Sequence, residues 1–247
     1  MSAIKVAVIN ASTVLKDADA GKAVPALQAQ VHNDFAPAWG VDADLVFIPR
    51  GAAPPAGAWW LTILDNSDQA GALGYHDLTD QGLPLGKVFA GTDIQFGSEW
   101  TVTASHELLE MLGDPDINLA AYVDQPNGGM RLYAYEVCDA CEADQFAYKT
   151  DGVLVSDFVY PAWFESFRKA GSTQFDRQSR INEPFQLLSG GYIGIFDCPS
   201  GGGWTQITGD RKARSYSMRP PVGSRRERRR TPREQWIRSE INKKKTR

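Results

Sequence analysis

The segment S-H-E-L-L-E at residues 105–110 constrains this chain more than any other, because it combines a helix with a possible metal site. The surrounding apolar pattern, with Gly and Pro just beyond it, predicts one helix over residues 98–112. Residues four apart on a helix share a face, so His106 and Glu110 can reach one ion. Glu107 lies about 100° round the helix from His106, where its carboxylate could act as a general base.

The apolar pattern predicts an α/β (α+β) chain with a mostly β second half. Short β-branched runs alternate with one helical run before the motif helix. The predicted strands cover residues 4–9, 44–49, 59–64, 72–77 and 87–92, with a helix over 22–36 between the first two. After the motif helix we predict strands over 132–137 and 152–160 and a hairpin within 190–208.

The motif resembles the H-E-x-x-H of zinc metallopeptidases, with Glu110 in the place of the second histidine. The order strand, helix, three strands, motif helix is similar to the catalytic half of the zincins. This resemblance implies a zincin-like mixed sheet with an active-site helix over residues 1–118, and a β-rich part over 119–208 that completes the site. The Glu110 exchange makes the ligand set more anionic and harder than that of the family.

The same resemblance implies zinc as cofactor and hydrolysis of a peptide or protein substrate. The metal would lower the pKa of bound water, Glu107 would take its proton, and the water would attack a polarised carbonyl. A tyrosine assists this step in metzincins, which makes Tyr135 a candidate for a substrate or transition-state contact. His76, on a predicted strand near the motif helix, is a second candidate.

A catalytic zinc site uses three protein ligands, so one more is needed beside His106 and Glu110. Residues 106–116 resemble the metzincin pattern H-E-x-x-H-x-x-G-x-x-H/D, in which Asp116 would be the third ligand. In gluzincin-like enzymes a later glutamate serves instead, which brings in Glu136 or Glu142. The sequence leaves all three open.

The charge is divided between an acidic body and a basic tail. Residues 1–208 hold 11 Lys/Arg and 26 Asp/Glu, whereas residues 209–247 hold 15 and 4. We expect this basic C-terminal tail to bind an acidic protein surface or, without sequence preference, nucleic acid. The body could form homo- or hetero-oligomers.

The sequence shows no signal peptide and no apolar run of membrane-spanning length. The chain is also similar to a group of uncharacterised bacterial and phage-encoded proteins in three segments, residues 105–107, 135–139 and 155–158. We therefore expect a cytoplasmic or virion-associated location. The alternative function is that of a structural or assembly protein of a virion or particle. A redox role would depend only on Cys138 and Cys141, a single C-x-x-C.

Overall fold

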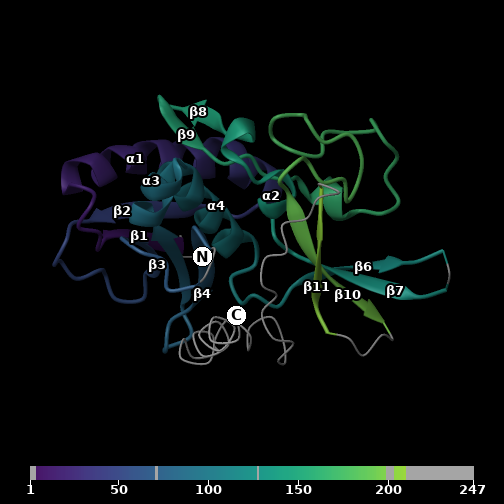
Figure 1. Ribbon diagram of the computed structural model, residues 1–247, viewed down its shortest axis with the longest axis horizontal. Coiled ribbons are helices and arrows are strands. Elements are labelled where there is room, and N and C mark those ends of the chain that lie inside the picture. Colours follow the sequence, from purple (N-terminus) through teal and green to yellow (C-terminus); the bar gives the residue numbers. More distant parts are fainter. Residues whose placement is uncertain (1–3, 70–71, 127, 199–202, 210–247) are drawn as a thin grey trace, which may run out of the picture.

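A five-stranded mixed sheet forms the scaffold of the first half of the chain (Figure 1). The computed structural model describes residues 4–69, 72–126, 128–198 and 203–209. The strand order is β2-β1-β3-β5-β4, and only the edge strand β4 runs antiparallel to its neighbour. The strands are β1 (Ile4–Asn10), β2 (Ala43–Ile48), β3 (Trp59–Leu64), β4 (Gly74–Leu78) and β5 (Pro84–Phe89). All five lie where the apolar runs predict strands. The strand predicted over 87–92 ends at Phe89, where the short helix α3 (Ala90–Phe96) follows it.

A long helical segment packs on the sheet and connects β1 to the parallel strand β2, as a parallel pair requires. It begins with α1 (Asp17–Ala29), passes through a π-helical turn (Gln30–Phe35) and ends with α2 (Ala36–Trp39). Leu27 and Phe35 of this segment are fully buried in the main core. The segment confirms the predicted helix and extends it at both ends.

The motif helix α4 (Trp100–Gly113) lies in the interior of the molecule. Eleven of its 14 residues are buried, because it packs against β4 and β5 of the large sheet and against the hairpin strand β9 (Val153–Val155). The Ser105 Oγ accepts a hydrogen bond from the backbone N–H of Ser156 (2.5 Å), which fixes the helix to the segment after β9. The helix is therefore held on two sides, and its polar motif is removed from bulk water.

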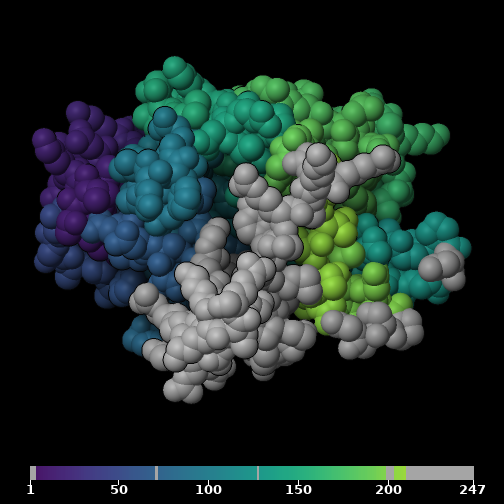
Figure 2. Space-filling model, in the orientation of Figure 1, coloured from purple at the N-terminus to yellow at the C-terminus, as the bar shows by residue number. Residues whose placement is uncertain are grey.

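The second half is mostly β, as predicted, and its main sheet is antiparallel in the order β11-β10-β7-β6. Its strands are β6 (Ala120–Asp124), β7 (Met130–Ala134), β10 (Tyr192–Cys198) and β11 (Thr205–Thr208), and β8 (Tyr148–Thr150) pairs with β9. A second core gathers around the fully buried Trp163 and Phe175. The strand predicted over 152–160 forms only as the shorter β9. The two halves pack together over the upper part of the space-filling view (Figure 2).

Within the described residues, no helix is long and apolar enough to cross a lipid bilayer. Nearly all of the predicted basic tail lies outside the described part of the chain, which ends at Gly209. Its binding to acidic surfaces or nucleic acid therefore stays a prediction.

Two buried carboxyl groups, Asp157 and Asp176, meet in the segment that follows β9. Asp157 Oδ1 accepts hydrogen bonds from the backbone N–H groups of Phe158 (2.8 Å) and Gln178 (3.2 Å). Asp176 accepts two further backbone bonds, so both acids organise the local chain. Burial, and then the adjacent Asp176 carboxylate, raise the pKa of Asp157 from 3.8 to about 8.

We predict that Asp157→Asn abolishes part of the pH dependence of stability. The folded state holds a proton on Asp157 that the unfolded state releases near pH 3.8, so the free energy of unfolding should fall as the pH rises from about 4 to about 8. One pKa unit corresponds to about 1.4 kcal/mol. At pH 9 the free energy of unfolding of Asp157→Asn should therefore be higher than that of wild type by more than about 1 kcal/mol. Urea unfolding at several pH values measures this.

The exposed acid Asp80 provides the matched control, because Asp80→Asn leaves the buried pair intact. Parallel stability curves for wild type and Asp157→Asn would contradict the raised pKa of Asp157 in the folded state.

Candidate metal centre

His106, Glu110 and Asp139 converge on one point from two elements. α4 carries the first two residues, and the 3₁₀ turn Asp139–Cys141 carries the third. His106 Nε2 lies 3.3 Å from Glu110 Oε1 and 3.3 Å from Asp139 Oδ1. Ligands about 2.0–2.2 Å from a tetrahedral zinc lie about 3.3–3.6 Å from each other. Both distances from His106 fit this range and all three ligand atoms lie within 4.8 Å of one another, so the group could hold a metal ion.

Asp139 reaches this point because glycine lets two elements approach closely. A Cβ on Gly191, which directly precedes β10, would lie only 2.3 Å from the carbonyl oxygen of Ala140. The N–H of Leu188 donates to that same carbonyl (2.9 Å) and fixes the turn. The neighbouring acids Glu136 and Glu142 were expected from the sequence, whereas Asp139 was missed. Its only signal was its place within the same acidic run.

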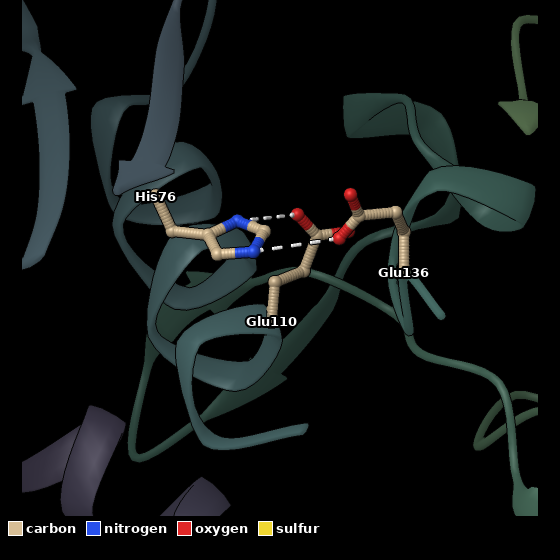
Figure 3. A group of neighbouring side chains, drawn as sticks. All are labelled: His76, Glu110 and Glu136. Carbon is tan, nitrogen blue, oxygen red and sulfur yellow. Dashed lines mark ion pairs between the residues drawn. The ribbon is translucent and has the colours of Figure 1, made fainter. Parts of the chain in front are cut away.

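A second group, His76, Glu110 and Glu136, lies beside the first and shares Glu110 with it. His76 comes from β4 and is 1% exposed. Its Nδ1 lies 3.3 Å from Glu110 Oε2, and its Nε2 lies 3.5 Å from Glu136 Oε2. Figure 3 shows both carboxylates pointing toward the imidazole ring. His76 was expected to contact substrate, and Glu136 was one of three candidate third ligands; the structure places both among the possible ligands of this second group.

Glu107 fits into space left by a glycine of the large sheet, Gly74, and lies in ordinary contact distance of a second, Gly86. A Cβ on Gly74 would lie 2.7 Å from Glu107 Oε1, and one on Gly86 would lie 3.5 Å from Glu107 Cβ. Glu107 Oε2 is buried, has no hydrogen-bond partner among the described residues, and lies 3.8 Å from His76 Nδ1. Burial, opposed by His76 and His106 and assisted by Glu110, raises the Glu107 pKa above its ordinary value. This shift brings the carboxylate nearer to the range that suits a general base.

Without a metal ion, the centre is a network of buried opposite charges. Burial alone would lower the pKa of His106, but Glu110, Asp139 and Glu107 hold it well above its ordinary value. Burial would raise the Glu110 pKa, but His106 and then His76 hold it well below its usual range. Burial and the Glu110 charge raise the Asp139 pKa. A cation bound among these carboxylates would replace the histidine protons as their counter-charge.

The structure does not bring Asp116 to the centre. The chain turns after α4 around the fully buried Asp114, whose carboxylate accepts hydrogen bonds from the N–H groups of Asn118 (3.0 Å) and Leu119 (3.1 Å). Asp116 is exposed and belongs to neither group of possible ligands. The metzincin-like spacing is present, but Asp114 and not Asp116 turns inward.

Glu142 lies close to the centre without joining either group of possible ligands. Burial raises the pKa of Glu142 to about 7; Glu110 and Glu107 add to the rise, whereas His106 and the Tyr192 hydroxyl oppose it. Burial and then the charge of Asp139 raise the Tyr192 pKa well above its ordinary value. Tyr192 was not expected from the sequence, and it places a hydroxyl next to the acidic centre.

Tyr135 lies in an aromatic cluster of the second core. Its ring stacks on Phe164, with centroids 4.3 Å apart, and meets Trp39 edge to face at 5.4 Å. These contacts show that the Tyr135 ring packs against other aromatic rings. Its role as a transition-state contact stays a prediction.

Cys138 and Cys141 are both buried free thiols. Burial raises the pKa of each well above its ordinary value, and the Glu110 carboxylate adds to the effect at Cys138. Thiols of this kind are poor nucleophiles, since the thiolate is the reactive form. The backbone N–H of Cys138 instead lies 3.4 Å from Glu110 Oε1, where it can donate to that carboxylate.

Comparisons with known proteins gave no match: no family model, no curated protein and no solved structure is detectably similar to this chain. A function for the protein therefore has to be inferred from the site itself.

We predict that Gly74→Ala disturbs the centre through Glu107. The added methyl group would meet Glu107 Oε1 and Thr103 Cγ2, each 2.7 Å from the position that an alanine Cβ would take, so we expect a loss of about 1–3 kcal/mol in the free energy of unfolding. Chemical denaturation measures the change.

Gly21→Ala serves as the control. Its Cβ would lie 3.5 Å from the Phe47 ring, an ordinary contact, within helix α1. It should stabilise the protein by about 0.5–1 kcal/mol. Equal effects at the two positions would show that Glu107 is not confined by Gly74.

Proposed function

We propose that this protein is a metal-dependent hydrolase of amide bonds, with zinc held by His106, Glu110 and Asp139. The observation that carries the proposal is the convergence of three buried ligand atoms, two of whose separations are 3.3 Å and all of which lie within 4.8 Å, with a further buried carboxylate, Glu107, on the same helix. The zincin-like activity that the motif suggests belongs to this proposal. In it, Asp139 takes the place of the third ligand.

The ligand set favours a divalent ion of intermediate hardness. One imidazole nitrogen and two carboxylate oxygens are suitable ligands for zinc. This ligand set also suits manganese and iron, which bind less well to sites with cysteine ligands. Two carboxylates make the set more anionic than two histidines would. A bound ion of this kind supplies a Lewis acid and an acidified water molecule.

The residues of the chain would manage the proton. Glu107 is the candidate general base, because its Oε2 is buried without a hydrogen-bond partner in the described structure and its pKa is raised. Glu142, with a pKa of about 7, is a candidate for returning a proton to the leaving amine. The Tyr192 hydroxyl acts on the pKa of Glu142, and in this proposal it takes the place of the hydroxyl that the sequence suggested at Tyr135.

The first experiment measures metal content and hydrolysis on the same samples. Wild type dialysed after zinc loading should retain zinc, and Asp139→Asn and His106→Ala should each hold about one ion fewer. Glu107→Gln should keep its zinc and lose about 10²–10⁴-fold in the rate of hydrolysis of a peptide library.

Glu183→Gln, at an exposed glutamate, is the matched control and should behave as wild type. Circular dichroism separates loss of metal from loss of fold. Absence of zinc from the wild-type protein would refute the proposal, and retention of zinc without hydrolysis of any peptide would refute its enzymatic part and favour the alternative of an assembly protein.

A further inference from the structure

The Glu110 carboxylate faces two histidines, one with each oxygen. Oε1 lies 3.3 Å from His106 Nε2, and Oε2 lies 3.3 Å from His76 Nδ1. A carboxylate that offers its oxygens in two directions can bridge two metal ions, which in two-metal hydrolases lie about 3.5–4 Å apart. We propose that this centre binds two divalent metal ions, bridged by Glu110, with the second ion held by His76 and Glu136.

The two halves of the centre are matched in composition. Each has one histidine and one carboxylate of its own, His106 with Asp139 and His76 with Glu136, and each shares Glu110. Within each group one ligand atom from each residue lies within 4.8 Å of the others. In the first group both carboxylates face Nε2 of His106, whereas in the second Glu110 faces Nδ1 and Glu136 faces Nε2 of His76. The second group is also the more deeply buried, since His76 is 1% and Glu136 3% exposed.

The charge of the centre supports two ions over one. Four buried carboxylates, those of Glu107, Glu110, Glu136 and Asp139, surround the two histidines. With neutral histidines as ligands and all four carboxylates ionised, two divalent cations would leave the centre without net charge. Uncompensated charge in the interior is strongly unfavourable.

The Glu107 carboxylate gives independent support for a second ion near His76. Its Oε2 is buried, has no hydrogen bond among the described residues, and is 3.8 Å from His76 Nδ1. A buried carboxylate oxygen in this situation is expected to face a cation or a water molecule. This places the candidate base of the proposed function next to the second ion, so that water held there would be within its reach.

The two-ion centre rests on the proposed function and extends it, and metal stoichiometry tests it separately from hydrolysis. Protein stripped with a chelator and reloaded with Mn²⁺ should bind two ions per chain in wild type and in Glu183→Gln. Glu136→Gln should bind one, and so should Asp139→Asn. Electron paramagnetic resonance of fully loaded wild type should show a magnetically coupled manganese pair, and Glu136→Gln should show an isolated ion.

The wild-type spectrum needs no variant, so the test stands even if a substitution prevents folding. One ion per chain with an uncoupled spectrum would overturn the inference and leave His76 and Glu136 as residues that only position Glu110. If the protein hydrolyses peptides with a single ion, the proposed function stands and the two-ion centre is wrong. If it holds a coupled pair but hydrolyses nothing, the two-ion centre stands and the proposed function is wrong. Failure to bind any ion would refute both.

Discussion

The buried negative charge of α4 and the adjoining turn is the constraint on which the rest of the structure depends. Glu107 and Glu110 are each at most 5% exposed, and Glu136 and Asp139 lie against the same region. Carboxylates in such surroundings need counter-charges, and His76 and His106 are the partners that the structure gives them. A sheet of apolar strands and a well-packed helix would fold more easily without these groups. Their presence in the interior is consistent with a centre that could hold a metal ion.

The backbone around the centre is adapted to these side chains. Gly74 leaves room for Glu107 between helix and sheet, and Gly191 lets the segment before β10 approach the turn that carries Asp139. Larger residues at these positions would separate the elements that bring the ligands together. The ligands are thus placed by rigid elements, β4 and α4, and by one turn held through backbone contacts, an arrangement that favours precise geometry.

Local periodicity explains why part of the site could be predicted from the sequence. His106, Glu107 and Glu110 are arranged by one helix, and the helix ends at Gly113 as its sequence indicates. The fold class followed from strand and helix patterns for the same reason. Asp139 could not be selected over Glu136 and Glu142, because the choice depends on how a 3₁₀ turn packs against β10. Asp116 matched a family spacing, but the inward turn of Asp114 left it in solvent.

His76 lies on β4, the edge strand of the large sheet, and pairs there with β5 alone. An edge strand held by one neighbour is the part of a sheet most open to exchange and to pairing with other chains. An ion that joined His76 to Glu110 and Glu136 would fasten this edge to the interior and close two chain loops at once. Metal supply would then set the lifetime of the folded protein in the cell, since a chain without metal would lose this attachment of an edge strand and become more open to proteases and to aggregation.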